Sequence, residues 1–215
     1  MLEPITWIKQ STYRWAGDGL TVYVDSWGAG EDAEPADVVF ITHAHYDHFD
    51  QDDIARIRTD DTIFVAPADV ARELSGAVTP VSPGDTIDVK GIKGQAVPAY
   101  NVAEQRLDKH PKANNWVGYV LELGGSTYYF SGDTDALPEL EDVRTDVAFV
   151  CVGGDPFVMT PSEAAGLVKA IEPQLAVPNH YGFEVGRPAN GEEFQREADP
   201  VKVEILSPVV AFTKS

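Results

Sequence analysis

The stretch ITHAHYDHF, residues 41–49, holds three histidines and one aspartate within six positions, in a chain that has five histidines in all. These four side chains are His43, His45, Asp47 and His48. The apolar run Val38–Thr42 leads into them and reads as a strand buried on both faces. Alternate strand residues share a side, so the first two histidines can face one volume, and a turn would bring the aspartate and the last histidine there. Imidazole and carboxylate suit zinc, manganese or iron, so the stretch predicts a metal site.

The length and the composition predict a single domain, residues 1–215, with a substantial core, since 43% of the residues are hydrophobic. No run approaches 18 apolar residues, and the start MLEPITWIKQ lacks a basic region followed by an apolar one. We therefore expect no membrane span, no secretory signal and a cytoplasmic protein. The one cysteine, Cys151, lies in an apolar run and is expected to be a buried hydrophobic residue.

The chain is strongly acidic, with 35 acidic and 16 basic residues and a formal net charge of -19. Such a surface repels phosphate backbones and anionic membranes. We therefore expect a small-molecule substrate and neither a nucleic acid nor a membrane as partner. The excess of aspartate also resembles the surfaces of proteins from high-salt cells, a hypothesis that predicts lower stability when salt is removed.

Other segments read as further strands and short helices. Three more apolar runs predict buried strands: Thr62–Ala66, Val147–Val152 and Leu175–Pro178. Two short amphipathic helices are expected at Asp52–Arg58 and Asp69–Ser75. A third and stronger helix begins after Thr160, where Pro161 fits the first turn, Glu163 completes a capping box and Pro173 stops it.

A second set of strands is expected to be antiparallel. Thr21–Asp25 is expected to pair with Ile5–Lys9, and Trp116–Asp133 reads as a hairpin that turns at Gly124-Gly125. Since strands and helices are interleaved in both halves of the chain, we predict an α/β fold with sheets in the middle and helices outside.

The histidine cluster resembles the HxHxDH signature of the metallo-β-lactamase fold superfamily. Downstream, Gly132-Asp133-Thr134 is similar to the GDT segment of that family, and His180 in AVPNHYG is similar to its last metal ligand. The resemblance covers nearly the whole chain and implies a four-layer αββα sandwich. The segments VGG, MTPSEAA, IEP and VPNHYG are most similar to small hydrolases related to ascorbate-6-phosphate lactonases and N-acyl-phosphatidylethanolamine phospholipase D.

The resemblance implies two divalent metal ions per chain, zinc in the first place, with manganese or iron as alternatives. His43, His45 and His110 would hold the first ion, and Asp47, His48 and His180 the second, with Asp133 bridging them. Asp47 is the implied catalytic residue, which would orient the attacking hydroxide and take up its proton. Asp25 and Asp37 read as structural, or as acceptors for imidazole N–H groups.

The chain departs from the family at one ligand. The third histidine usually follows a strand within PAxH, whereas this chain reads Pro98-Ala99-Tyr100-Asn101. Asparagine is a poor zinc ligand, so we expect His110 to complete the first site from its loop. The alternatives are that Asn101 or water fills the position and that His110 is a surface residue.

These patterns predict a dinuclear metal hydrolase that acts on an ester, a lactone or a phosphodiester. One alternative is a metal-binding module without turnover, which the asparagine at position 101 favours. The other is a nuclease, which the acidity and the lack of a basic stripe disfavour.

Overall fold

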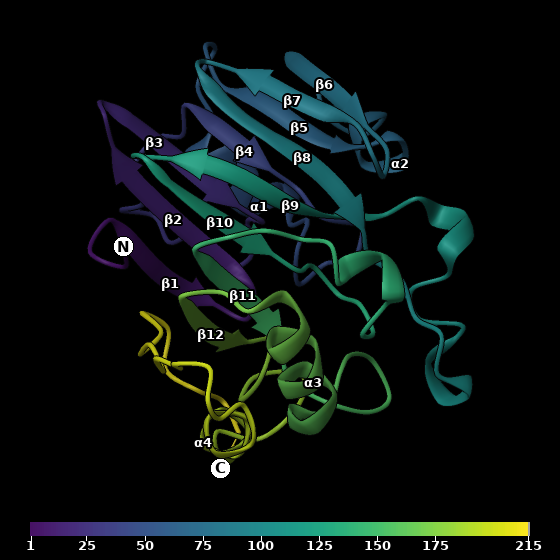
Figure 1. Ribbon diagram of the computed structural model, residues 1–215. Helices are drawn as coiled ribbons and strands as arrows, with labels where there is room; N and C mark the ends of the chain where they lie inside the picture. Colours follow the sequence, from purple (N-terminus) through teal and green to yellow (C-terminus); the bar gives the residue numbers. More distant parts are fainter. Residues whose placement is uncertain (215) are drawn as a thin grey trace.

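Residues 1–214, which this computed structural model describes, form two six-stranded sheets and four α-helices (Figure 1). The first sheet has the order β1 (Ile5–Lys9), β2 (Thr12–Gly17), β3 (Leu20–Val24), β4 (Val38–Phe40), β5 (Ile63–Pro67), β6 (Ala77–Val81). The second has the order β12 (Leu175–Asn179), β11 (Val147–Cys151), β10 (Ser126–Phe130), β9 (Val117–Leu123), β8 (Ile92–Pro98), β7 (Thr86–Val89). The α-helices are α1 (Gln51–Ile57), α2 (Ala68–Ala71), α3 (Pro161–Ile171) and α4 (Ala189–Glu197). Short 3₁₀ turns are η1 (Glu104–Arg106), η2 (Lys112–Asn114) and η3 (Pro138–Leu140).

The two faces of the first sheet bury two different cores. Phe40 and the other inward-facing residues of β3 and β4 pack in the core between the sheets, which also contains Tyr119 of β9. The alternate residues, such as Val39, pack in a second core with Ile54 and Ile57 of α1. On the far side, α3 contacts β11 and α4 contacts β12. The predicted four-layer αββα sandwich is therefore confirmed.

The predicted buried strands are confirmed as β4, β5, β11 and β12, with ends that differ by one or two residues. The predicted hairpin is β9–β10, in which Ser126 pairs with Leu123. Both turn glycines, Gly124 and Gly125, have positive φ, the conformation that a two-residue hairpin turn of type I′ requires. Cys151 is fully buried, as expected.

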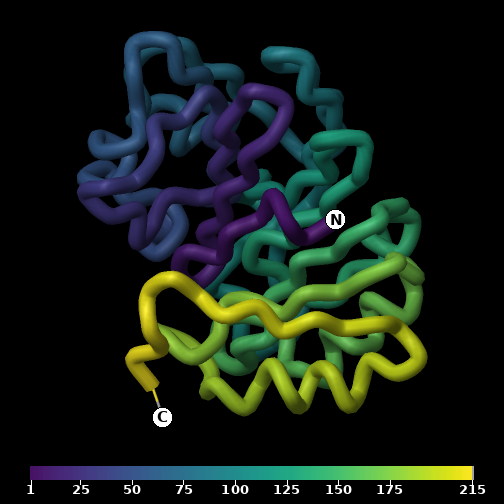
Figure 2. Tube along the Cα trace, turned by 90° about the vertical axis from the view of Figure 1, so that its left-hand side faces the viewer, coloured from purple at the N-terminus to yellow at the C-terminus, as the bar shows by residue number. Residues whose placement is uncertain are grey.

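The predicted pairing of Thr21–Asp25 with Ile5–Lys9 is wrong. The intervening β2 pairs with both β1 and β3 in an antiparallel meander, and β3 pairs on its other side with β4 in parallel. The β1–β2 and β2–β3 connections are short enough to form two hairpins. β2 therefore lies between β1 and β3, which were predicted to pair directly. Residues 209–210 run back along β1, where Val209 N–H donates to the Trp7 carbonyl (Figure 2).

The helix predictions differ in how well they hold. α3 has the predicted capping box: Thr160 Oγ1 accepts from the backbone N–H of Glu163, whose carboxylate accepts from the N–H of Thr160. It ends at Ile171, before Pro173. The helix predicted at Asp69–Ser75 is shorter and earlier, since α2 spans only Ala68–Ala71. No helix within residues 1–214 is long and apolar enough to cross a membrane.

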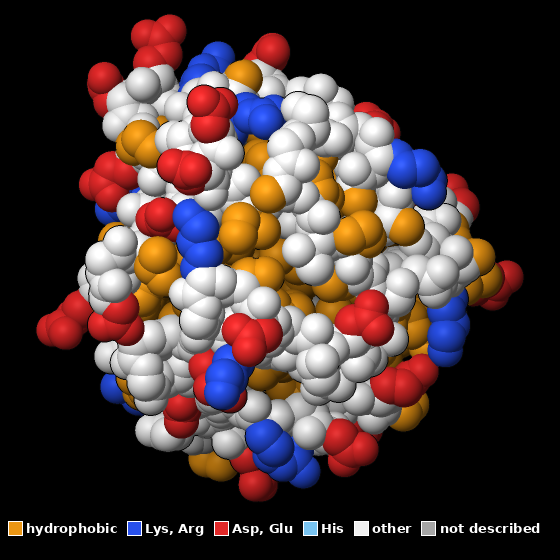
Figure 3. Space-filling model, turned by 90° about the horizontal axis from the view of Figure 1, so that it is seen from above, with side chains coloured by type: hydrophobic (Ala, Val, Ile, Leu, Met, Phe, Trp, Pro, Cys, Tyr) orange, Lys and Arg blue, Asp and Glu red, His pale blue; other side chains and the backbone are white. Residues whose placement is uncertain are grey.

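A tyrosine ties the sheets together. The Tyr119 hydroxyl on β9 donates to the carbonyl oxygen of Ile41, just after β4, at 2.7 Å and to that of Val65, within β5, at 3.1 Å. The second sheet is thereby fixed beside the strand end that carries the histidine cluster. Seen from above, acidic side chains are spread around the molecule with apolar ones between them, and no histidine is visible in this view (Figure 3).

Candidate metal centre

The structure brings all seven predicted ligands together where strands of both sheets end. His43, His45, Asp47 and His48 follow β4, Asp133 follows β10 and His180 follows β12, while His110 reaches in from the loop between β8 and β9. Three sets of side chains offer ligand atoms within 4.8 Å of one another: His43 with His45 and His110, His43 with His48 and Asp133, and Asp47 with His48 and His180. The first and third sets are the two ligand sets that the family resemblance implies for the two metal ions.

Asp133 lies between the two sets. Its Oδ2 is 3.2 Å from Nε2 of His110 on one side and 2.9 Å from Nε2 of His180 on the other. Its Oδ1 is 3.3 Å from Nε2 of His48. In the first set, Nε2 of His43 is 3.1 Å from Nδ1 of His45. The position of the carboxylate is the one expected of a bridging ligand.

Two residues of the centre have backbone in the left-handed region, where residues other than glycine are uncommon. Asp25 has φ +57° and follows β3, and His180 has φ +56° and follows β12. The turn at His180 packs tightly, because a Cβ on Gly153 would lie 2.3 Å from the His180 carbonyl oxygen. Sharp turns at the strand ends thus direct both side chains into the centre, and backbone conformations of this kind cluster at functional sites.

Asp25 and Thr42 fix the protonation of two rings. Asp25 accepts from the Thr42 N–H at 2.8 Å and from its hydroxyl at 3.0 Å, so the hydroxyl oxygen accepts from Nδ1 of His43 at 3.0 Å. Nδ1 of His48 donates to Asp25 at 2.6 Å. With hydrogen on Nδ1, each ring turns the lone pair of Nε2 towards the cluster. Asp37, the other predicted acceptor, instead accepts from the Thr21 N–H.

Asn101 is the acceptor that orients the ring of His110. Its backbone N–H donates to the His110 carbonyl at 2.8 Å, and its amide Nδ2 donates to Asp135 at 3.2 Å. Because a carboxylate only accepts, the amide oxygen must face Nδ1 of His110, which donates to it at 2.8 Å. His110 therefore presents Nε2 to the cluster, whereas the side chain of Asn101 lies behind that ring.

An arginine holds the carboxylate behind Asn101. Arg106 is 1% exposed and donates to three carboxylates: Asp135 at 2.5 Å, Asp155 at 2.6 Å and Glu163 at 2.8 Å. Glu163 is also the capping residue of α3. The loop that carries His110 is thus fixed to the helix on the far side of the second sheet.

The buried, unpaired ligand atoms and the local charges fit a divalent metal. Within the part of the chain that the structure describes, Nε2 of His48, Nε2 of His110 and Oδ1 of Asp133 are buried without a hydrogen-bond partner. Burial would lower the pKa of His180, but Asp133 and Asp47 raise it to about 9. Burial, and then the charge of His48, hold the pKa of His43 well below its usual value. Asp133 and Asp47 thus favour positive charge on His48 and His180, a charge that a divalent cation would replace, and imidazole with carboxylate is the donor set that zinc, manganese or iron prefers.

Sequence analysis missed Gln10. Its amide Nε2 donates to Oδ2 of Asp47 at 2.9 Å and lies 3.1 Å from Nε2 of His180. The residue occupies the turn between β1 and β2 with φ +47° and reaches the site from the far N-terminus. No local pattern marks it, because its partners are 37 and 170 positions away.

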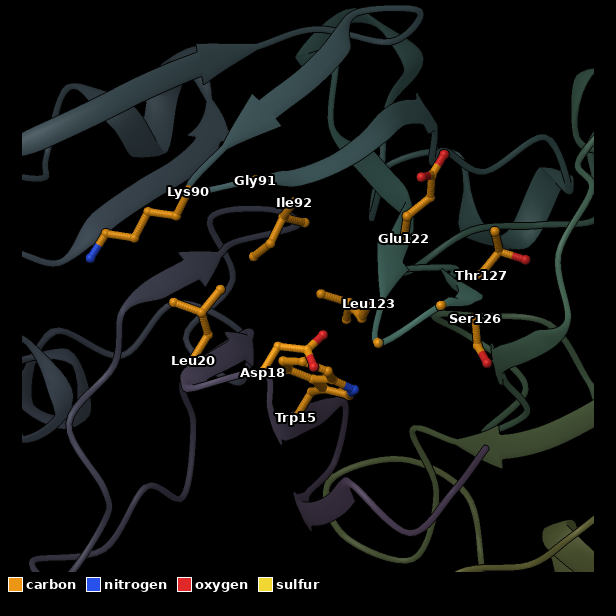
Figure 4. A pocket seen from close by; sticks show the side chains of 12 residues that line it. Trp15, Asp18, Leu20, Lys90, Gly91, Ile92, Glu122, Leu123, Ser126 and Thr127 are labelled. Atoms are coloured by element: carbon orange, nitrogen blue, oxygen red, sulfur yellow. The ribbon is translucent and has the colours of Figure 1, made fainter.

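A cavity of about 210 Å³ opens onto the centre. Four predicted ligands line it, namely His45, Asp47, Asp133 and His180, and the other walls are Tyr46, Phe157, Glu184 and Val185. A second cavity, of about 460 Å³, lies where the β2–β3, β7–β8 and β9–β10 turns meet (Figure 4). None of the seven predicted ligands is among the residues described around it, so the smaller cavity is the candidate active site.

Comparisons with known proteins agree with this geometry. The beta-lactamase superfamily domain matches residues 4–180. A UPF0173 metal-dependent hydrolase of Methanopyrus kandleri is 32% identical over 225 residues, covering 95% of this chain and 96% of the relative. Another, from Thermococcus onnurineus, is 36% identical over 184 residues and 80% of each chain.

Solved structures show the same fold. A crystal structure from Parabacteroides distasonis has a TM-score of 0.85 and 31% identity, covering 95% of this chain and 92% of that one. Igni18, a metallo hydrolase of Ignicoccus hospitalis, has a TM-score of 0.75 at 20% identity, covering 95% and 94%, and supports the fold alone. The narrower likeness to ascorbate-6-phosphate lactonases stays a prediction.

Proposed function

The chain belongs to the beta-lactamase superfamily and, within it, to the UPF0173 metal-dependent hydrolases, and from that premise we propose that it is a dinuclear hydrolase. The bond it cleaves is an ester, a lactone or a phosphodiester in a small molecule, and the metals are two divalent ions, zinc in the first place. The observation that carries the proposal is the position of Asp133 between two sets of imidazoles.

The ligand assignment follows the inward-facing lone pairs. His43, His45 and His110 hold one ion, Asp47, His48 and His180 hold the other, and Asp133 bridges them. Bound divalent ions would supply Lewis acidity, which lowers the pKa of water from about 15.7 to about 7 and polarises the scissile bond.

The protein's own contribution to the chemistry centres on Asp47. Burial would raise the pKa of this carboxyl, but the charges of His48 and His180 lower it to about 2, so it is ionised at neutral pH. Gln10 donates to Oδ2 and so fixes the orientation of the Asp47 carboxylate. Asp47 also lines the cavity. We assign Asp47 the role of orienting the attacking water and, where bound ions would replace the protons of His48 and His180 that lower its pKa, of accepting the proton of that water.

Metal analysis together with a substrate panel tests this function. We expect two metals per chain after reconstitution with Zn²⁺, Mn²⁺ or Fe²⁺, and hydrolysis of a generic ester, lactone or phosphodiester that a chelator abolishes. A single tightly held metal and no turnover across the panel would instead indicate a metal-binding module. Cleavage of single-stranded or structured RNA would favour a nuclease, against which the net charge of -19 argues.

A further inference from the structure

The cavity beside the centre has walls of a distinct chemical character. Apart from the predicted ligands, it is lined by two aromatic rings, one valine and one carboxylate: Tyr46, Phe157, Val185 and Glu184. Tyr46 is 58% exposed, yet its ring packs edge-on against Trp27 with centroids 5.8 Å apart. The part of a substrate that extends from the reacting bond would therefore contact apolar and aromatic surface.

Basic side chains are absent from these walls among the residues described. The guanidinium of Arg106 is occupied by its three carboxylates. Two ammonium groups, those of Lys9 and Lys109, lie over aromatic rings at or beside the cavity but are not among its lining residues. Nζ of Lys9 is 3.2 Å from the centre of the Trp27 ring, and Lys109 pairs with Asp108 at 3.0 Å, with its Nζ 5.7 Å from the centre of the Phe157 ring.

Glu184 supplies a negative charge at this cavity. Within the described residues no basic group forms a salt bridge with its carboxylate, although the Glu184 charge does act on the ammonium of Lys9, and Lys214 donates to its backbone carbonyl. Apart from the predicted ligands, the walls therefore combine one carboxylate with two aromatic rings and a valine.

We propose that this cavity selects an uncharged or cationic substituent, so that the substrate is a carboxylic ester or lactone without a phosphate, and that Glu184 determines this specificity. The inference rests on the proposed hydrolase function and reduces its three candidate bond types to two, the carboxylic ester and the lactone. An anionic substituent would meet the Glu184 charge with no basic side chain in the lining to offset it, whereas a cation would be stabilised by that charge and by the rings of Tyr46 and Phe157.

The test uses matched acetate esters and the metal-loaded protein. Acetylcholine carries a cation, 3,3-dimethylbutyl acetate is its neutral isostere, and 2-sulfoethyl acetate carries an anion. We expect kcat/KM to fall in that order, with bis(4-nitrophenyl) phosphate cleaved least. Glu184→Gln should lower the preference for the cation over the neutral ester by about 3- to 10-fold, and Glu184→Lys should reverse it. Glu204→Gln, at an exposed residue outside the cavity walls, is the matched control and should leave the order unchanged.

Equal or faster turnover of the anionic ester or the phosphodiester overturns the proposal. A separate measurement keeps this outcome apart from failure of the hydrolase function. By calorimetry, choline should bind more tightly than 3,3-dimethylbutanol and 2-hydroxyethanesulfonate, and Glu184→Gln should remove the difference. If no ester is cleaved but this binding order holds, the hydrolase function fails and the cavity assignment stands, whereas tighter binding of the sulfonate refutes the assignment.

Discussion

Two regions of the centre orient their histidines with different acceptors. At the end of β4, the acceptor behind His48 is the buried carboxylate of Asp25, at 2.6 Å. In the loop after β8, the acceptor behind His110 is the neutral amide of Asn101, at 2.8 Å. There the charge lies one residue further back, on Asp135, and Arg106 compensates it.

The difference lies in what supports each acceptor. Asp25 and Thr42 follow paired strands of one sheet, so the regular hydrogen bonds of that sheet hold them in place. Asn101 lies in a loop, and a buried ion-pair cluster holds it instead. An amide also donates less charge to its histidine than a carboxylate does, so we expect the strand-end region to contribute more to metal affinity.

Replacing the residue shared by both regions should have the largest effect. We expect Asp133→Ala to abolish hydrolysis and to lower the metal content, because both imidazole sets lose their common carboxylate. Elemental analysis and turnover of a generic ester measure the two effects together. Asp142→Asn, at an exposed aspartate, is the control. Turnover that survives in Asp133→Ala would remove the bridging role.

Asp25→Asn should have the next largest effect. Nδ1 of His48 loses a charged acceptor, and we expect metal affinity to fall by about 10- to 100-fold. Competition with a chromophoric chelator measures the affinity without reference to activity. Unchanged affinity would show that the sheet alone orients the ring.

Asn101→Ala should have a smaller effect, about 10-fold, because the acceptor it removes is neutral. The same chelator competition measures it, and Val102→Ala, at the exposed neighbour, serves as the control. A loss as large as that in Asp25→Asn would contradict the ranking of the two regions. No loss at all would mean that His110 needs no acceptor to reach the site.

A change in salt concentration should have the smallest effect on the difference in metal affinity between the two regions, since both are buried. It should act on the surface instead, where a net charge of -19 is screened as ionic strength rises. We expect added NaCl to stabilise the wild type, and a gain of about 1 kcal/mol would raise Tm by about 2–4 °C. Thermal unfolding at low and high salt measures this. A Tm indifferent to salt would sink the high-salt hypothesis.

Sequence reasoning was strongest where a local pattern carries the physics. Continuous apolar runs gave β4, β5, β11 and β12, and the residues Thr160 and Glu163 gave the start of α3. Six of the seven candidate ligands came from short motifs at strand ends, whereas His110 was predicted as the remaining histidine, in a loop. Whether each of them binds metal stays a prediction.

It failed where contacts join distant segments. The place of β2 between β1 and β3 depends on two tight turns, of which the first, at Gln10-Ser11, carries no hairpin signal. The second, Asp18-Gly19, does carry one, with both residues at positive φ, and sequence analysis overlooked it. Gln10 follows β1 and Asp47 follows β4, with two strands of the same sheet between them, so their contact depends on the strand order. The hydrogen bond from His110 Nδ1 to the Asn101 amide oxygen depends on a loop that Arg106 holds in place, and sequence analysis did not single out that arginine.

The bond from Tyr119 to the carbonyls of Ile41 and Val65 has a consequence for biosynthesis. The ligands extend from position 43 to position 180, and this tyrosine joins the halves of the chain that carry them. A nascent polypeptide therefore carries four donors of the HAHYDH stretch long before His180 is translated. If these predicted ligands hold the metal, its full retention requires closure of the sandwich, and we expect metal loading to be late in the maturation of the protein.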